Sequence, residues 1–244
     1  MLPAVARRAV ILAGGLGTRL RPYTVVLPKP LMPVGDRPVL DIVIRQLHAA
    51  RFDRVTMATG YLAELIEAFF RDGSDYDLPI DYFREHEPLG TVGALGLIDE
   101  LDDPFLVMNG DILTDLDYGQ LLDDHIRSDA IATIATRTTK VQISLGVLDF
   151  ADPDDSTLLT NYFEKPNIEY ESSMGVYCFD PRIREFISPG EHLDFPDLML
   201  RLVHEGEKVR AWRSNDFWLD IGRPEDYEQA QDDIEALRHR LIPE

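Results

Sequence analysis

The first half of the chain alternates two hydrophobic patterns. Continuous apolar runs, which predict strands buried on both faces, are followed by segments whose apolar residues recur at helical spacing. In the first helical segment, Val39, Val43 and Leu47 fall on one stripe. These patterns predict strands over residues 8–14, 54–60, 79–85 and 104–111, and helices over 38–50, 62–73 and 89–101. Strands separated by helices of this length predict right-handed βαβ units and a mostly parallel sheet.

The second half of the chain is less regular and predicts strands that follow one another without helical crossovers. The predicted strands cover residues 130–138, 144–150, 159–166 and 173–180, followed by a helix over 194–206, two short strands at "KVRAWRS" and "FWLDIG", and a helix over 224–241. The 244 residues therefore predict a single α/β domain, Rossmann-like, with a mostly parallel mixed sheet flanked by helices. We expect residues 1 to about 128 to form a nucleotide-binding half, and residues from about 129 to 244 to form a mixed half with a lid-like region.

The charge balance of the chain limits its partners. The 44 acidic and 24 basic side chains give a formal net charge of −20. Nucleic acids and anionic membranes are bound by basic surfaces, so this balance argues against both. No segment approaches the roughly 18 consecutive apolar residues of a membrane span, and the first apolar run is too short for a signal peptide, so a cytoplasmic protein is expected. Cys178 is the single cysteine and lies in an apolar run, so a buried, inert thiol is expected.

The segment "AGGLGTRLRPYTVVLPKPLMPVG" (13–35) directly follows the first predicted strand. In an open α/β sheet, ligands bind beyond the carboxyl ends of the strands. Gly14, Gly15 and Gly17 allow backbone N–H groups to approach phosphate oxygens closely. The side chains that would accompany this backbone nest are polar or positive: Thr18, Arg19 and Lys29. The spacing matches neither G-x-G-x-x-G nor a P-loop, which excludes a generic dinucleotide-binding dehydrogenase.

Lysine is rare in this chain, which has four lysines and twenty arginines. Two of the four precede a proline, Lys29 in "PKP" (28–30) and Lys165 in "EKP" (164–166). A lysine ammonium is a compact point charge that suits contact with a phosphate group. The two K-P motifs therefore indicate two phosphate-binding positions.

At these motifs the chain resembles the sugar nucleotidyltransferases, also called NDP-sugar pyrophosphorylases. The resemblance begins at "LAGGLGTRLRPYT" and "LPKPLMPV" and continues, in the family's order, through "EPLGTVGAL" (87–95), "MNGD" (108–111), "LGVLDF" (145–150), "EKP" (164–166), "MGVYCF" (174–179) and "WLDIGRPEDY" (218–227). It covers nearly the whole chain and is closest to the mannose-1-phosphate and heptose-1-phosphate guanylyltransferases. The C-terminal left-handed β-helix that many relatives append is not expected in this sequence.

The resemblance implies that a sugar 1-phosphate attacks the α-phosphorus of a nucleoside triphosphate and that pyrophosphate leaves. Such an in-line displacement requires positioning and neutralisation of charge more than an acid or a base. By the same resemblance, Lys29 lies at the α-phosphate and Arg19 at the leaving phosphates. Mg²⁺, which prefers carboxylate and phosphate oxygens, is implied as cofactor on Asp111 and Asp220. The catalytic residues implied are Arg19, Lys29 and Asp111.

The resemblance also implies where the two substrates bind. The nucleotide site consists of Leu12, Gly14, Gly15, Gly17, Thr18, Glu85, Glu87, Pro88, Gly90 and Thr91. The second half would hold the sugar phosphate through Gly146, Glu164, Lys165 and Gly175. The strand glycines among these, Gly146 and Gly175, can equally mark bulges.

The position of Glu85 favours guanine as the base. Relatives that use UTP or dTTP carry a glutamine here, and the glutamine amide both donates to and accepts from a pyrimidine edge. A carboxylate only accepts, so Glu85, or Glu87 two residues on, suits the adjacent N1–H and N2–H₂ donors of guanine. The sequence therefore predicts that GTP is the preferred triphosphate.

Two alternatives remain open at this stage. One keeps the fold and changes the substrates, to a hexose-1-phosphate thymidylyl- or uridylyltransferase or to a transferase acting on a cyclitol phosphate. The other is a catalytically silent subunit that binds NDP-sugars, which is less favoured because Arg19, Lys29, Asp111 and Asp220 are all present. The expected partners are a nucleoside triphosphate and a sugar 1-phosphate, and the sequence also allows a homo-oligomer.

Overall fold

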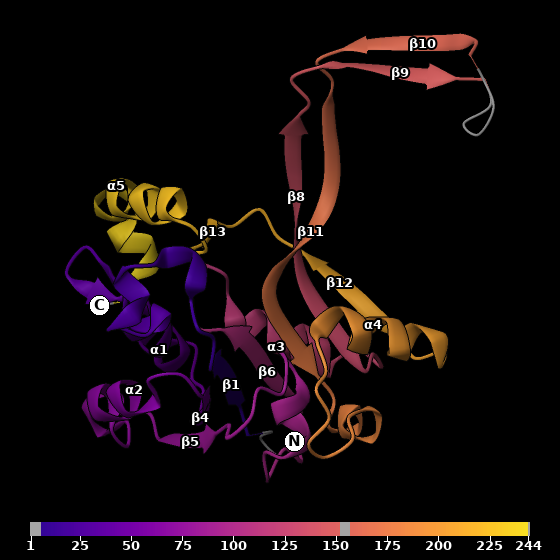
Figure 1. The fold of residues 1–244 in the computed structure, drawn as a ribbon. Helices are drawn as coiled ribbons and strands as arrows, with labels where there is room; N and C mark the ends of the chain where they lie inside the picture. The colour runs from indigo at the N-terminus through magenta and orange to yellow at the C-terminus, as the bar shows by residue number, and fades with distance from the viewer. Residues whose placement is uncertain (1–5, 152–156, 244) are drawn as a thin grey trace.

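A mixed sheet of seven strands forms the centre of the molecule (Figure 1). The computed structural model describes residues 6–151 and 157–243. In spatial order, the strands are β12 (Val209–Arg213), β8 (Ala132–Gln142), β11 (Asn167–Phe179), β6 (Phe105–Asn109), β1 (Arg8–Ala13), β4 (Arg54–Thr59) and β5 (Ile80–Arg84). The neighbours β6, β1, β4 and β5 run parallel, whereas β11 is antiparallel to both β6 and β8. The predicted α/β fold with a mostly parallel mixed sheet is confirmed.

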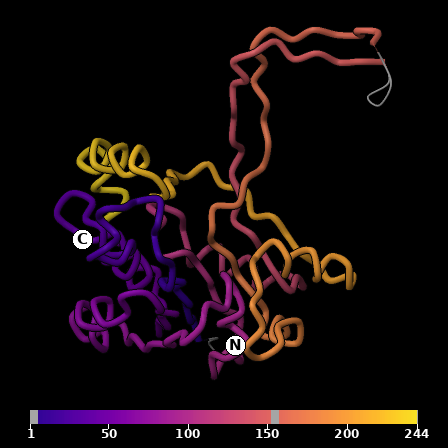
Figure 2. The backbone as a smooth tube through the Cα atoms, in the orientation of Figure 1, coloured from indigo at the N-terminus to yellow at the C-terminus, as the bar shows by residue number. Residues whose placement is uncertain are grey.

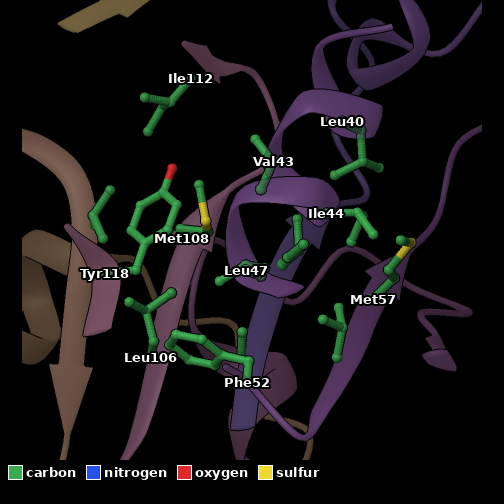
Figure 3. Packing of buried hydrophobic residues seen from close by; sticks show 14 of the residues in the cluster. Leu40, Val43, Ile44, Leu47, Phe52, Met57, Leu106, Met108, Ile112 and Tyr118 are labelled. Carbon is green, nitrogen blue, oxygen red and sulfur yellow. The ribbon is translucent and has the colours of Figure 1, made fainter. Parts of the chain in front are cut away.

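Helices cover both faces of this sheet because its strands are apolar on both sides. Along β1, Ala9 and Ile11 join the core on one face, and Val10 joins the core on the other. The helices are α1 (Val39–Ala49), α2 (Ala63–Phe70), α3 (Tyr118–Ile126), α4 (Phe195–His204) and α5 (Pro224–Leu241). Figure 3 shows the apolar stripe of α1, including Val43 and Leu47, packed against strand residues. The helix α4 packs on the opposite face, together with residues 92–101.

The segment 89–101 does not form the predicted helix. Only Gly93–Gly96 takes a short 3-10 turn. Gly90 has a φ of +75°, and a Cβ at this position would lie 2.5 Å from the carbonyl oxygen of Leu193. A Cβ on Gly93 would lie 2.2 Å from the carbonyl oxygen of Glu191. The glycines therefore serve close packing against the loop before α4, and this tertiary contact replaces the helix.

A two-stranded arm extends from the sheet. The ladder of β8 and β11 continues beyond the other strands to the pair Gln142 and Asn167. It then turns into a hairpin of β9 (Gly146–Phe150) and β10 (Leu159–Glu164). Figures 1 and 2 show this arm rising away from the helices and the rest of the sheet. The predicted strands of the second half are thus present, but β11 begins six residues earlier than the start predicted at 173.

Two short pairings and two local findings complete the fold. Strand β7 (Ile112–Thr114) pairs with β13 (Trp218–Asp220), and β2 (Pro33–Val34) pairs with β3 (Arg37–Pro38). Cys178 is fully buried and burial raises the pKa of its thiol, as expected for an inert cysteine. Among the described residues, no helix has both the length and the apolar composition needed to cross a membrane.

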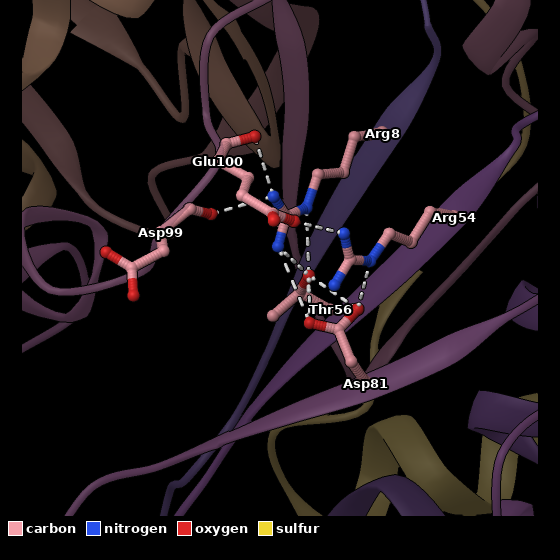
Figure 4. Close-up of polar contacts among 6 residues, drawn as sticks. All are labelled: Arg8, Arg54, Thr56, Asp81, Asp99 and Glu100. Carbon is pink, nitrogen blue, oxygen red and sulfur yellow. Dashed lines mark hydrogen bonds and ion pairs between the residues drawn. The ribbon is translucent and has the colours of Figure 1, made fainter.

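Arg8 joins three strands at the amino ends of the parallel sheet (Figure 4). Its guanidinium donates to Thr56 Oγ1 at 2.7 Å and to the carbonyl oxygens of Asp99 and Glu100, both at 2.8 Å. It also forms an ion pair with Asp81 at 3.5 Å. The side chain of Arg8 is only 11% exposed. Its bonds to Thr56 are buried, and its bonds to Asp81 and to the two carbonyl groups are partly buried.

We expect Arg8→Met to lower the free energy of unfolding by about 3 kcal/mol, because it leaves several buried or partly buried acceptors without their donor. Arg54→Met is the matched control, since Arg54 contacts the same Asp81 from the neighbouring strand but is 41% exposed. It should cost less than about 1 kcal/mol, as exposed ion pairs do. Urea unfolding of both variants measures the difference, and equal losses would contradict the role given to Arg8.

Candidate active site

A cavity of about 780 Å³ lies at the carboxyl ends of the parallel strands. Leu12 and Ala13 reach it from β1, Gly60 follows β4, and Asn109 ends β6. This is the edge at which open α/β sheets bind ligands. The predicted nucleotide-binding and catalytic residues that line it are Leu12, Gly14, Gly15, Gly17, Thr18, Arg19, Lys29, Glu85, Glu87, Pro88, Gly90, Thr91 and Asp111. The structure therefore brings these thirteen residues together around one space, although their roles stay predictions.

The glycine-rich loop enters the cavity directly from β1. Gly17 has a φ of +58°, a conformation that favours glycine. A Cβ on Gly17 would lie 2.9 Å from Thr24 Cγ2, and the Thr24 hydroxyl donates to the Gly17 carbonyl oxygen at 2.7 Å. Thr24 thus fixes the loop through Gly17 without lining the cavity itself, whereas residues 14–17 line the cavity.

Glu85 lies against this loop. A Cβ on Gly14 would lie 3.1 Å from Glu85 Oε1, so the carboxylate is in close contact with the glycine-rich loop. Glu85 Oε2 accepts from the backbone N–H of Leu89 at 3.3 Å. Burial raises the pKa of the Glu85 carboxyl, and this hydrogen bond opposes the rise only in part. Glu87, the other acid predicted to contact the base, also lines the cavity but is exposed.

The segment that follows Glu87 is fixed by the second half of the chain. The backbone N–H of Thr91 donates to Asp194 Oδ1 at 2.9 Å, and the Thr91 hydroxyl accepts from the backbone N–H of Phe195 at 2.8 Å. These two bonds join one wall of the cavity to the start of α4. The wall containing Pro88, Gly90 and Thr91 is therefore held in place by residues about a hundred positions away.

Lys29 lies between two carboxylates at the other end of the cavity. Its ammonium forms an ion pair with Asp111, and it lies 3.7 Å from Asp220 Oδ1. Asp220 reaches this position because β13 pairs with β7 next to Asp111, where the backbone N–H of Ile221 donates to the Asp111 carbonyl oxygen at 3.2 Å. Burial, and then the Asp111 carboxylate, raise the pKa of Asp220, whereas Lys29 and Arg19 lower it.

The two carboxylates fit a divalent cation. Asp111 Oδ1 is buried and has no hydrogen-bond partner among the described residues, so this oxygen remains available to a ligand. Among the described residues, no group of three or more His, Cys, Asp or Glu side chains is arranged to hold a metal ion. A pair of aspartates beside a phosphate-sized space suits Mg²⁺, which takes its remaining ligands from phosphate oxygens and water.

The predicted sugar-phosphate residues lie outside the lining of the cavity. Glu164 and Lys165 are exposed on the arm, 3.9 Å apart in an ion pair, where β10 turns into β11. Gly146 is also on the arm, and a Cβ there would lie 2.3 Å from the Tyr162 hydroxyl, so its small size accommodates Tyr162.

Gly175 lies nearer to the cavity and has a packing role. It has a φ of +71° at a register shift in β11, which agrees with the bulge alternative. A Cβ there would lie 2.9 Å from the Nδ2 atom of Asn109, a residue that lines the cavity.

Several cavity residues were not predicted from the sequence. Tyr61 directly follows one predicted strand, and Asn109 lies near the carboxyl end of another. The rule that ligands bind at the carboxyl ends of parallel strands could therefore have identified both residues. His192 comes from the loop before α4 and carries no local signal that points to the cavity. His86 lies between the two predicted glutamates and was not assigned a role.

Comparisons with known proteins agree on one family. The sequence matches the nucleotidyl transferase family over residues 8–236. It is 36% identical to the UTP–glucose-1-phosphate uridylyltransferase of Synechocystis sp., over 91% of this chain and 62% of that protein. It is 31% identical to the mannose-1-phosphate guanylyltransferase of Mycobacterium tuberculosis, over 93% of this chain and 64% of that protein. The chain thus spans less than two thirds of the length of these curated relatives.

A solved structure shares most of the fold. The crystal structure of HddC from Yersinia pseudotuberculosis complexed with GMP-PN matches with a TM-score of 0.70 and 27% sequence identity. The match covers 93% of this chain and 99% of that chain.

Proposed function

We propose that this chain, which belongs to the nucleotidyl transferase family, joins a nucleoside triphosphate to a sugar 1-phosphate and releases pyrophosphate. The observation that carries this proposal is the position of Lys29, held between Asp111 and Asp220 in the cavity that the glycine-rich loop borders. In the reaction, a phosphate oxygen of the sugar 1-phosphate forms a bond to the α-phosphorus, and the bond from the α-phosphorus to the pyrophosphate oxygen breaks.

The residues of the cavity supply charge and orientation rather than proton transfer. The backbone N–H groups of residues 14–17 and the Arg19 guanidinium hold the β- and γ-phosphates, which leave as pyrophosphate. Lys29 contacts the α-phosphate, where negative charge accumulates in the transition state. Mg²⁺ on Asp111 and Asp220 would neutralise further phosphate charge when it is bound.

Guanine is the base that the cavity favours in this proposal. Glu85 is half-buried, only accepts when ionised, and lies beside the loop that borders the cavity. The M. tuberculosis relative is a guanylyltransferase, and the HddC structure is described as a complex with GMP-PN. The uridylyltransferase of Synechocystis keeps UTP as the second candidate.

The sugar is proposed to be of the mannose or heptose type, bound as its 1-phosphate by Glu164 and Lys165. The exposed arm carries both residues, so this role requires the arm to approach the cavity when the substrate binds. The charge of Lys165 supports the assignment, because a phosphate ester needs a positive partner near the attacking oxygen.

Lys165→Ala is expected to raise the KM for the sugar 1-phosphate by about tenfold, and to raise the KM for the triphosphate much less. The matched control is Lys140→Ala, which removes a lysine from the same arm at a position paired with Glu169. Steady-state kinetics with each substrate varied in turn measures the two constants. A larger effect on the triphosphate would mean that the two substrate sites are assigned the wrong way round.

A matrix of nucleoside triphosphates against sugar 1-phosphates tests the proposed function itself. Pyrophosphate release is measured with GTP, UTP, dTTP, CTP and ATP, each combined with mannose, glucose and heptose 1-phosphates and a cyclitol phosphate, in the presence of Mg²⁺. We expect release with GTP and a mannose- or heptose-type phosphate. Release from no pair would support the silent, NDP-sugar-binding alternative, and a preference for UTP or dTTP would support the second enzyme candidate.

A further inference from the structure

Arg137 lies where the arm leaves the sheet. We call residues 136–137 of β8 and 172–175 of β11 the arm root, because β12 pairs with β8 only as far as Thr136 and β6 pairs with β11 only from Val176 onward. Arg137 is partly buried, and within residues 6–151 and 157–243 it forms no ion pair, although the chain carries 44 acidic side chains. Its guanidinium is therefore used for contacts of another kind.

The Arg137 guanidinium contacts Trp218, the first residue of β13. It donates to the Trp218 carbonyl oxygen at 3.0 Å, and its Cζ atom lies 5.5 Å from the centroid of a Trp218 ring. This distance is typical of a cation–π contact. The indole N–H of Trp218 donates to the Met174 carbonyl oxygen at 2.7 Å. Both strands of the arm root therefore hold the same tryptophan.

A short segment of the chain also connects the arm root to β13. The backbone N–H of Ser214 donates to the Thr136 carbonyl oxygen at 2.8 Å, and only residues 214–217 separate β12 from β13. Figure 1 shows these residues crossing from the arm root to β13. On the body of the protein, β13 pairs with β7, which directly follows Asp111. The strand β13 is thus attached both to the arm root and to the strand beside the cavity.

The position of the Asp220 carboxylate depends on the backbone of β13. In the described part of the chain this carboxylate accepts no hydrogen bond, and its ion-pair partner is Lys29 at 3.7 Å. Trp218 and Asp220 are two residues apart on one strand, so their side chains lie on the same face of it. A displacement of Trp218 would therefore move the carboxylate as well.

We propose that Arg137 is a positioning residue for the cation site. Through Trp218, it fixes the Asp220 carboxylate relative to Asp111 and ties this carboxylate to the arm. The inference rests on the proposed function, in which the two aspartates hold Mg²⁺ and the arm carries Lys165 to the sugar 1-phosphate. The site for the cation and the site for the second substrate are then set together, because the strand that carries one carboxylate is fastened to the arm.

Mn²⁺ binding to the free chain, measured by electron paramagnetic resonance of the unbound ion, tests the proposal without turnover. Mn²⁺ prefers the same oxygen ligands as Mg²⁺. Arg137→Met keeps a side chain of similar length and removes the charge and the donor. It should raise the dissociation constant for Mn²⁺ by about tenfold, as the loss of an outer partner of a metal ligand does. Asp220→Asn identifies the site, because the Mn²⁺ binding that this variant loses is the binding at Asp220.

Arg213→Met is the matched control. Arg213 ends β12 beside the arm root and pairs with Glu171 at 3.3 Å, so its partner lies on the arm and not on β13. This side chain is 75% exposed, and its loss should leave Mn²⁺ binding unchanged. Arg137→Lys restores a cation that can donate to the Trp218 carbonyl oxygen, so its dissociation constant should lie between those of the wild type and Arg137→Met. Circular dichroism confirms that each variant is folded.

The Mg²⁺ dependence of pyrophosphate release gives a second readout. The Mg²⁺ concentration for half-maximal rate should rise in Arg137→Met and stay unchanged in Arg213→Met. A loss of folded protein alone would lower the rate at every Mg²⁺ concentration without moving this midpoint.

Three results of the Mn²⁺ titration would overturn the proposal. These are an unchanged dissociation constant in Arg137→Met, an equal rise in Arg213→Met, and Mn²⁺ binding to the wild type that does not depend on Asp220. Failure of the proposed function is a separate result, since it appears as the absence of pyrophosphate release from every substrate pair, whereas Mn²⁺ binding is measured without substrates.

Discussion

Replacing Lys29 with alanine is expected to lower turnover by about 100-fold or more, because it removes a preorganised positive charge from the reacting phosphate. Asp111→Asn should have an effect of similar size, since an amide cannot supply the charge that a divalent cation needs. Pyrophosphate release with the best substrate pair measures both variants.

Lys208→Ala is the matched control for these variants. Lys208 is exposed and pairs with Asp129 at the start of β12, away from the cavity-lining residues. It should retain wild-type turnover. Near-normal turnover in both Lys29→Ala and Asp111→Asn would contradict the assigned site, and labelled α-phosphate trapped on the protein would contradict direct displacement.

The second large effect is expected in the choice of base. Glu85→Gln should lower the ratio of kcat/KM for GTP to kcat/KM for UTP by about 100-fold, because bidentate acceptance from N1–H and N2–H₂ is lost. The amide can instead meet a donor and an acceptor on a pyrimidine. Inosine triphosphate lacks only the N2 amine, so the wild-type enzyme should use it less well than GTP and better than ATP.

Glu87→Gln is the matched control for this specificity change, since Glu87 also lines the cavity but is exposed. It should alter the GTP/UTP ratio less than Glu85→Gln does. If neither substitution moves the ratio, the base is selected by other groups, and the role given to the glutamates is wrong.

The raised pKa of Glu85 adds a pH dependence to this selection. Only the ionised carboxylate accepts both guanine donors, so the preference for GTP should be strongest at pH values above the raised pKa of Glu85. As the pH falls through the raised pKa, Glu85 gains a proton and the preference should weaken. In Glu85→Gln the GTP/UTP ratio should stay constant over the same range.

Local sequence patterns determined much of the framework. The strands at 8–13, 54–59, 80–84 and 105–109 and the helices at 39–49 and 224–241 lie close to their predicted ranges. Their apolar periodicity reflects burial on a sheet or along a helix face, and this information is carried by neighbouring residues. The glycine-rich loop was predictable for the same reason, because it directly follows a buried strand.

Contacts between distant residues decided the rest. The segment 89–101 contains a helical pattern, but the carbonyl groups of Glu191 and Leu193 occupy the space that side chains at Gly93 and Gly90 would need. The pairing of β7 with β13 brings Asp220 to Asp111 across more than a hundred residues, which no local pattern specifies.

The arm shows the same division most clearly. The sequence predicted strands in this arm, but the register of Val141 with Ile168 and of Leu148 with Tyr162 decided which side chains share a face. The placement of Lys165 on this arm, outside the cavity lining, also follows from tertiary structure. Hydrophobic periodicity is a local property and can be read along the chain, whereas register and the juxtaposition of charges depend on which distant segments pack together.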